Sequence, residues 1–178
     1  AAQRFAEAEA LLSGDAPLAH LQRHVALKAL AWRGQGDERY RAFYDLERFV
    51  ATPIIETPPG YADLAAFNAA LAQVIERLHA TTARPLDQTL FNGTQSVGRL
   101  WNEPYPEIEA LKAALLKAAK AFVSALPDDP GHPFLKQKSL DLEPAGSWSV
   151  RLHSGGGHVD HIHPAGWISA AYYVVVPD

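Results

Sequence analysis

The sequence predicts an α+β fold in which helices pack on an antiparallel sheet or barrel. Apolar residues recur with the helical period over residues 64–78 and 106–126, whereas apolar and polar side chains alternate over residues 148–153, as in a strand. The helical segments precede the strand-like ones, and no strand–helix–strand units alternate along the chain. This order favours helices on an antiparallel sheet over a parallel, doubly wound sheet.

The composition narrows the classes of protein to consider. The chain has 178 residues, 48% of them hydrophobic, so it is long enough to bury a core. Acidic and basic residues are interspersed at a net charge of −4, without a basic stripe, so we expect no nucleic-acid partner. No apolar run approaches the roughly 20 residues that span a bilayer, so we expect no membrane insertion. The absence of cysteine excludes disulfides and thiolate sites and favours the cytoplasm.

The N-terminal third of the chain has a helical pattern. Its apolar segments lie at residues 5–12, 24–32 and 40–50. Gly14 and Gly34–Gly36 separate these segments, as helix-ending residues do. Short helices joined by a Gly-Asp turn are similar to the end of a tetratricopeptide-type array, although a plain helical cap explains the pattern equally well. We predict a helical, tetratricopeptide-like region over residues 1–48 and a second domain over residues 49–178.

The second domain is expected to combine two long helices with short strands. Asp63 opens the first helix, and Pro106 suits the first turn of the second, where its missing N–H is not needed. Strand-like runs lie at residues 88–95, 148–153 and 172–176. The middle run is predicted to be half-buried, because Trp148, Val150 and Leu152 alternate with polar residues.

A cluster of metal-ligating residue types lies between the last two of these runs. Its members are His153, His158, Asp160, His161 and His163. Imidazole is the commonest metal ligand and works together with carboxylates, so the cluster predicts a metal site. Side chains on a strand share a face every second residue, which pairs His158 with Asp160, and His161 with His163, on opposite faces. A regular strand would direct only one of these pairs into a pocket.

The ligand types limit the metal. Imidazole and carboxylate suit iron, zinc, copper or nickel, and the lack of thiolates disfavours a closed structural zinc site. Two ligands at i and i+2, with a third from a later strand, would form the open facial array of non-heme Fe(II) oxygenases. A zinc hydrolase is the rival, but metallo-β-lactamase-type enzymes order their ligands H-x-H-x-D-H, whereas this chain has H-x-D-H-x-H. The glycine run Gly155–Gly157 either lets the backbone approach a ligand closely or forms a hairpin tip.

Several short motifs point to a family. They are residues 147–152 (SWSVRL), 161–164 (HIHP), 166–169 (GWIS) and 172–173 (YY), with residues 85–89, 93–95 and 132–134 upstream. On these motifs the chain resembles 2-oxoglutarate- and Fe(II)-dependent dioxygenases of the prolyl-hydroxylase-like branch, in particular bacterial oxygenases in which this domain follows tetratricopeptide repeats. The resemblance covers about residues 49–178.

The resemblance implies a double-stranded β-helix (jelly-roll) barrel under the helices, with Fe(II) as cofactor and 2-oxoglutarate as cosubstrate of a hydroxylation. It makes His161 and His163 the counterparts of the superfamily's His-x-Asp/Glu metal ligands. Tyr173, Ser169 and, as a third candidate, Arg151 would face the 2-oxoglutarate. The acceptor of the hydroxyl group would be a protein, a peptide or a small molecule.

The chain departs from the superfamily pattern in two ways. His163 stands where a carboxylate is expected, while a literal His-x-Asp, His158-Val-Asp160, lies just upstream. Either pair can supply the ligands, a bulge would let His158 join the other two, and the resemblance favours His161 with His163. The distal histidine and the basic partner of the far carboxylate are expected beyond Asp178, so we expect an incomplete barrel and a piece of a longer protein.

Two classes of function stay open. The first is an oxygenase whose helical N-terminal region presents a substrate. The second is a non-catalytic metal-binding barrel whose helical arm mediates protein contacts. A later histidine with a suitably spaced Arg or Lys would discriminate between them in favour of the enzyme.

Overall fold

A computed structural model describes residues 4–14, 16–17, 20–79 and 89–176. The chain forms two compact units, and each unit is discontinuous in sequence. The first unit consists of Ala1–Thr52, Phe122–Asp141 and Ile162–Ser169. The second unit consists of Pro53–Ala121, Leu142–His161 and Ala170–Asp178. The division into residues 1–48 and 49–178 stays a prediction.

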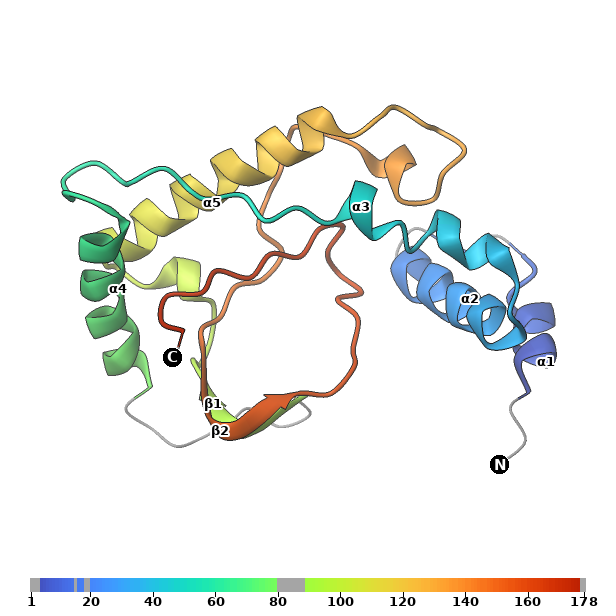
Figure 1. Ribbon diagram of the computed structural model, residues 1–178, viewed down its shortest axis with the longest axis horizontal. Helices are drawn as coiled ribbons and strands as arrows, with labels where there is room; N and C mark the ends of the chain where they lie inside the picture. The colour runs from blue at the N-terminus through green and yellow to red at the C-terminus, as the bar shows by residue number, and fades with distance from the viewer. Residues whose placement is uncertain (1–3, 15, 18–19, 80–88, 177–178) are drawn as a thin grey trace. The chain divides into compact units, whose positions relative to one another are not determined.

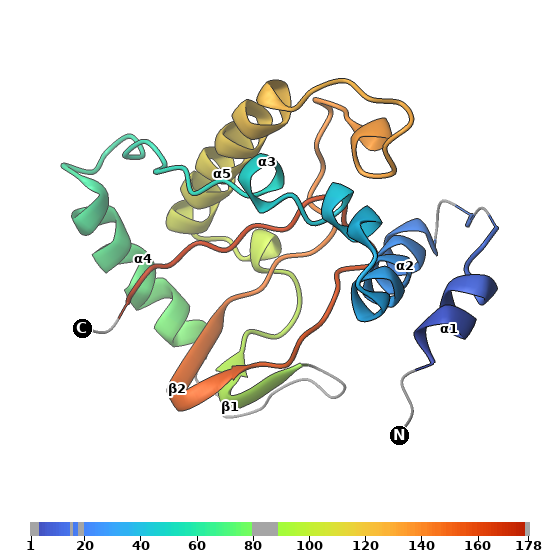
Figure 2. The same cartoon turned by 45° about the vertical axis from the view of Figure 1, so that its right-hand side comes forward.

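The secondary structure confirms the α+β class. The helices are accompanied by a pair of antiparallel strands, β1 (Leu90–Gln95) and β2 (Val150–His158), which run side by side in Figures 1 and 2 although a long helix separates them in the sequence. Within the described residues these two strands form a two-stranded sheet and not a closed barrel. None of the helices in the described part of the chain is long and apolar enough to cross a membrane.

The first unit begins with two helices, α1 (Phe5–Leu11) and α2 (Leu21–Gln35). They pack closely because Gly34 has no side chain, and a Cβ there would overlap the ring of Phe5. The second helix ends at Gly36, whose φ of 71° is the left-handed conformation that favours glycine at a helix end. Both helices and the glycine break between 34 and 36 confirm the prediction from apolar spacing.

The single helix predicted over residues 40–50 was wrong. The chain forms a 3₁₀ turn, η2 (Glu38–Ala42), and then a one-turn helix, α3 (Leu46–Phe49). Asp37 accepts a hydrogen bond from the backbone N–H of Arg39, and Asp45 accepts one from that of Arg48. Each aspartate starts its own turn, so the apolar residues between them do not continue one helix.

Aromatic side chains pack together in the first unit. Trp32 stacks on Phe43 at 5.2 Å, and the ring of Phe134 lies 5.0 Å from Phe49 and 5.1 Å from Trp167. His132 lies against Phe43 and Phe49, and its Nε2 donates to the carbonyl of Ala42 at 2.9 Å. Its Nδ1 accepts from the backbone N–H groups just before and at the start of the 3₁₀ turn η4 (Leu135–Gln137). These bonds fix one neutral tautomer of His132 as a structural connection.

Two long helices supply the core of the second unit, as predicted. Helix α4 (Leu64–Leu78) is capped by Asp63, whose carboxylate accepts from the N–H of Ala66 at 2.8 Å. Helix α5 (Pro106–Ala125) begins at Pro106, and its last turn belongs to the first unit. The buried core residues are Ile55, Phe67, Leu71, Val74, Leu100, Ile108 and Leu111.

The pair of strands contains a β-bulge. Leu90 pairs with His158 and Phe91 with Gly157, and the register then shifts before Gly93 pairs with Leu152. Asn92, at the shift, has a φ of 46° and donates from its side chain to the carbonyl of Ser154. A Cβ on Gly156 would overlap the carbonyl oxygen of Asn92. The glycine run therefore lies inside β2, where it allows the two backbones to approach, and is not a hairpin tip.

The strand predicted at residues 148–153 forms only from Val150 onward, and the predicted burial of its apolar side chains is not observed throughout. Trp148 is 42% exposed and Leu152 is 48% exposed, whereas Ser147 and Ser149 are each only 8% exposed. The serines point inward because they bond to other segments: Ser147 Oγ accepts from the N–H of Trp101, and Ser149 Oγ lies 2.9 Å from His79 Nε2. Specific hydrogen bonds outweigh the apolar alternation here.

The strand expected at residues 172–176 is not formed. Residues 170–176 are irregular, and Tyr172 donates from its hydroxyl to the side-chain oxygen of Asn68 at 2.7 Å. Tyr172 and Val174 also pack on the core of the second unit. This segment is therefore held by side-chain packing on helices, without a strand beside it among the described residues.

Candidate metal site

The histidine segment follows the end of the sheet. His158 is the last residue of β2, paired with Leu90, and residues 159–163 are irregular. The alternation of side chains between two faces therefore ends at His158 and does not determine where the later side chains point. The two predicted ligand pairs would lie on opposite faces only if a regular strand continued through residues 159–163, and it does not.

Thr89 and the backbone of Val159 hold two of the histidines. The hydroxyl of Thr89 lies 2.9 Å from Nδ1 of His158, and the carbonyl of Thr89 accepts from the N–H of Val159 at 3.0 Å. The carbonyl of Val159 lies 2.8 Å from Nδ1 of His161. Because a carbonyl only accepts, this nitrogen of His161 carries the proton, and in the neutral ring the lone pair is on Nε2.

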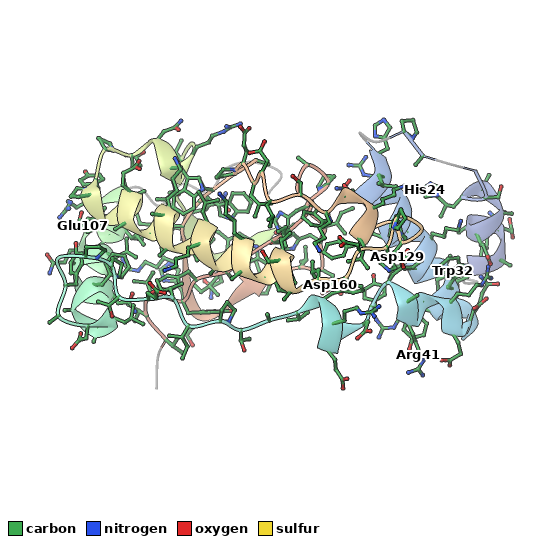
Figure 3. The ribbon with its side chains drawn as sticks, turned by 90° about the horizontal axis from the view of Figure 1, so that it is seen from above. His24, Trp32, Arg41, Glu107, Asp129 and Asp160 are labelled. Carbon is green, nitrogen blue, oxygen red and sulfur yellow. The ribbon has the colours of Figure 1, made fainter. Side chains whose placement is uncertain are left out.

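The rings of His158 and His161 lie together, with centroids 5.5 Å apart and planes inclined by 39°. Asp160, which is labelled in Figure 3, lies between these two histidines in the sequence, and its side chain is exposed. His163 is half-buried and belongs to the first unit, where its carbonyl accepts from the N–H of Gly166 at 3.2 Å. The structure thus brings together two of the four predicted ligands, His158 and His161.

These two imidazoles fit part of a metal site. Their ligand type suits Fe(II), and a hydrogen bond at Nδ1 is the usual support of an imidazole that binds metal through Nε2. Within the described part of the chain, no group of three or more His, Asp or Glu side chains is placed to hold a metal ion. The described residues therefore supply two ligands for a metal and leave its other positions to further groups.

The three predicted cosubstrate residues lie apart in the sequence and in different surroundings. Arg151 lies in β2 opposite Thr94, and its guanidinium is 3.7 Å from the carboxylate of Glu76. Tyr173 is 75% exposed, and Ser169 is exposed in the first unit. Of the upstream motif at residues 85–89, only Thr89 belongs to the described residues.

Sequence reasoning missed a polar centre around His79, the residue that ends α4. Its Nδ1 lies 2.8 Å from Thr94 Oγ1, and its Nε2 lies 2.9 Å from Ser149 Oγ. Burial lowers the pKa of His79, and the charge of Arg151 lowers it further. A lone histidine at a helix end gives no sequence signal of this role, since Ser149 is 70 residues away.

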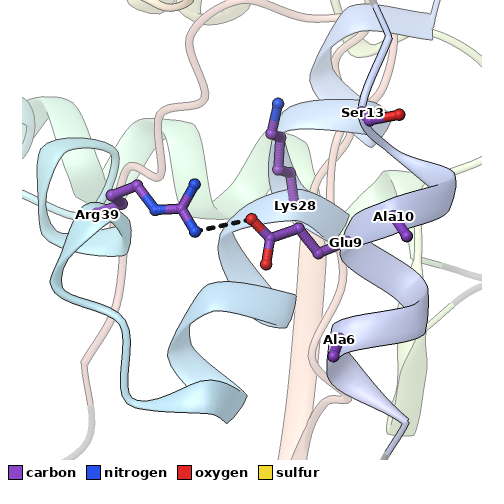
Figure 4. Close-up of a pocket in the computed structure, with 6 residues that line it drawn as sticks. All are labelled: Ala6, Glu9, Ala10, Ser13, Lys28 and Arg39. Atoms are coloured by element: carbon purple, nitrogen blue, oxygen red, sulfur yellow. Dashed lines mark hydrogen bonds and ion pairs between the residues drawn. The ribbon is translucent and has the colours of Figure 1, made fainter.

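A hollow lies in the first unit between α1, α2 and η2, away in sequence from the histidine segment. It has a volume of about 470 Å³ and is lined by Ala6, Glu9, Ala10, Ser13, Lys28 and Arg39. Figure 4 shows Arg39 and Glu9 directed toward each other, and their charged groups are 2.8 Å apart. Glu9 also accepts from the indole N–H of Trp32 at 2.7 Å. Glu9 is thus held by Arg39 and Trp32, while the ammonium group of Lys28 lies over the Trp32 ring, 5.5 Å from its centroid.

Comparison with known proteins gives one match. Residues 146–178 match the model of the family described as "Putative 2OG-Fe(II) oxygenase". No curated protein and no solved structure matches the chain. The matched segment contains β2 and the histidine segment, and it supports a relationship to the 2-oxoglutarate- and Fe(II)-dependent oxygenase superfamily. The match does not extend to the helical N-terminal region.

Proposed function

We propose that this protein is a non-heme Fe(II)- and 2-oxoglutarate-dependent dioxygenase that hydroxylates a C–H bond of its substrate. The family match over residues 146–178 carries the proposal, because it covers the candidate ligands and the candidate cosubstrate residues together. The paired rings of His158 and His161 support it independently, since they are the ligand type that Fe(II) uses. In this proposal β1 and β2 belong to a jelly-roll barrel.

The ligands in this proposal come from residues 158–163. The family resemblance favours His161 with His163, and His158 with Asp160 is the alternative pair. Bound Fe(II), with 2-oxoglutarate and dioxygen as co-reactants, supplies the oxidising chemistry. The imidazoles would hold the ion, and the hydrogen bond from His161 to the Val159 carbonyl supports the orientation of that ring.

Arg151, Ser169 and Tyr173 are the proposed contacts of 2-oxoglutarate. A guanidinium suits a carboxylate because its donors match the two oxygens, and Tyr and Ser hydroxyls add further donors. The ion pair of Arg151 with Glu76 is long, at 3.7 Å, so in this proposal its guanidinium donors turn to the added carboxylate. The proposed acceptor is a protein, a peptide or a small molecule in the cytoplasm, with the helical, tetratricopeptide-like N-terminal region presenting it.

One observation favours a second candidate function. The described residues hold no group of three metal ligands. A non-catalytic metal-binding module with a protein-binding helical arm is compatible with such an incomplete ligand set. A zinc hydrolase is the weaker alternative, because it also needs at least three protein ligands. These alternatives predict metal binding without any response to 2-oxoglutarate.

The experiment that separates them is an anaerobic titration of the protein with Fe(II), with and without 2-oxoglutarate. The oxygenase proposal predicts a weak visible charge-transfer band that appears only when both are present. Arg151→Gln should weaken the response to 2-oxoglutarate while Fe(II) still binds. Tight binding of zinc with no 2-oxoglutarate-dependent band would contradict the oxygenase and favour the metal-binding module.

A further inference from the structure

Thr89 contacts the histidine segment with two different groups. Its hydroxyl lies 2.9 Å from Nδ1 of His158, and its carbonyl accepts from the N–H of Val159 at 3.0 Å. The side-chain contact orients the imidazole of His158, and the backbone contact holds the N–H of the next residue, Val159. Thr89 itself is half-buried directly before β1, so it is anchored by the sheet.

The effect of Thr89 extends to the second imidazole. Val159, whose N–H bonds to Thr89, offers its own carbonyl to Nδ1 of His161 at 2.8 Å. Thr89 therefore contacts His158 directly and His161 through one intervening residue, Val159. This arrangement explains why the two rings lie together although residues 159–161 are irregular.

We propose that Thr89 is the positioning residue of a two-imidazole site for a divalent transition-metal ion, formed by His158 and His161. In this site the hydroxyl of Thr89 accepts from Nδ1 of His158, so both rings present the lone pair of Nε2 to the ion. A hydrogen bond at the distal nitrogen fixes the tautomer and raises the basicity of an imidazole ligand. The inference rests on the metal-binding part of the proposed function and not on its oxygenase chemistry.

The tautomers can be measured on the wild-type protein without any metal. Long-range ¹H–¹⁵N NMR of the imidazoles should find the proton on Nδ1 and a bare Nε2 in both His158 and His161. A proton on Nε2 of neutral His158 would mean that the Thr89 hydroxyl donates, and this result would overturn the proposal. The measurement does not depend on whether any variant folds.

The affinity test uses Co(II), without 2-oxoglutarate, at a pH above the ordinary titration range of imidazole. Thr89→Val keeps the size of the side chain and the backbone carbonyl but removes the hydroxyl, and it should weaken Co(II) binding by about 10- to 100-fold, the usual effect of losing such support. Thr89→Ser keeps the hydroxyl and should restore most of the affinity. Thr57→Val, at an exposed threonine of the same unit, is the matched control and should bind like wild type.

A double-mutant cycle shows whether Thr89 acts through His158. In the His158→Ala background, Thr89→Val should cause little further loss of Co(II) affinity, because the ring that the hydroxyl orients is gone. Additive losses, or equal affinities for wild type and Thr89→Val, would overturn the proposal. Loss of the 2-oxoglutarate-dependent Fe(II) band with this Co(II) pattern intact would instead contradict only the oxygenase function.

Discussion

At the scale of single residues, His79 connects three segments of the second unit through the two nitrogens of one ring. Thr94 and Ser149, its hydroxyl partners, come from β1 and from the residues just before β2, and both are buried. Arg151, whose charge acts on His79, forms a pair with Glu76 at 3.7 Å. A neutral imidazole satisfies both hydroxyls, and burial and Arg151 keep its pKa below the ordinary value.

The lowered pKa of His79 predicts that acid destabilises the protein. The unfolded chain binds this proton at the ordinary value of 6.5, whereas the folded protein binds it only at lower pH. Below that ordinary value the unfolded state therefore holds more protons, and the contribution of His79 to stability is lost as the pH falls. Urea denaturation at several pH values should show a decline that is smaller in His79→Gln. An identical decline in both proteins would contradict the prediction.

At the scale of elements, the bulge between β1 and β2 sets the register of the end of β2, where the histidine segment begins. Gly155 has a φ of 72°, and a Cβ on Gly156 would overlap the carbonyl of Asn92 and lie 3.0 Å from that of His153. Only glycine meets both demands without strain. The shifted register then pairs Leu90 with His158, next to Thr89. The glycine run is thus part of what sets the position of the first candidate ligand.

Substitution inside this bulge should therefore be costly. Gly156→Ala should lower the free energy of unfolding by about 1–3 kcal/mol, the usual cost of forcing extra atoms into packed structure. It should also shift the NMR signals of the His158 ring. Gly14→Ala is the matched control, because a Cβ at Gly14 would meet no atom within 4 Å, and its effect should stay within about 0.5 kcal/mol. Equal stabilities of the two variants would refute the role given to the bulge.

The start of α4 depends on one side chain that the sequence already indicates. Asp63 accepts from the N–H of Ala66, so Asp63→Ala should cost about 0.5–2 kcal/mol of stability by thermal or urea denaturation. Asp63→Asn keeps the acceptor oxygen and should cost much less. If the two substitutions cost the same, the side-chain cap is not what stabilises this end of the helix.

At the scale of the whole molecule, local signals were predictable and long-range polar contacts were not. Helical period, Asp63 and Pro106 predicted α4 and α5, because caps and apolar stripes are local in sequence. The burial of Ser147 and Ser149, just before β2, depends on partners far along the chain, so apolar alternation did not predict it. Residues 172–176 look like a strand by composition, but packing on α4 decided their conformation.

The candidate site was predicted in the same uneven way. The density of His and Asp at residues 158–163 pointed to metal chemistry, and the family match over residues 146–178 agrees with it. The pairing of His158 with His161 rests on Thr89 and on the Val159 carbonyl, which no spacing rule contains. The choice between His161 with His163 and His158 with Asp160 stays a prediction.

The most direct test of the central claim is therefore the anaerobic Fe(II) and 2-oxoglutarate titration carried out on His161→Ala beside the wild-type protein. If His161, which the family resemblance favours, binds the metal of an oxygenase, the wild type shows the 2-oxoglutarate-dependent charge-transfer band and His161→Ala does not, while their far-UV circular dichroism spectra agree. A band of equal strength in both proteins would contradict this ligand assignment, because the metal would then be held without His161.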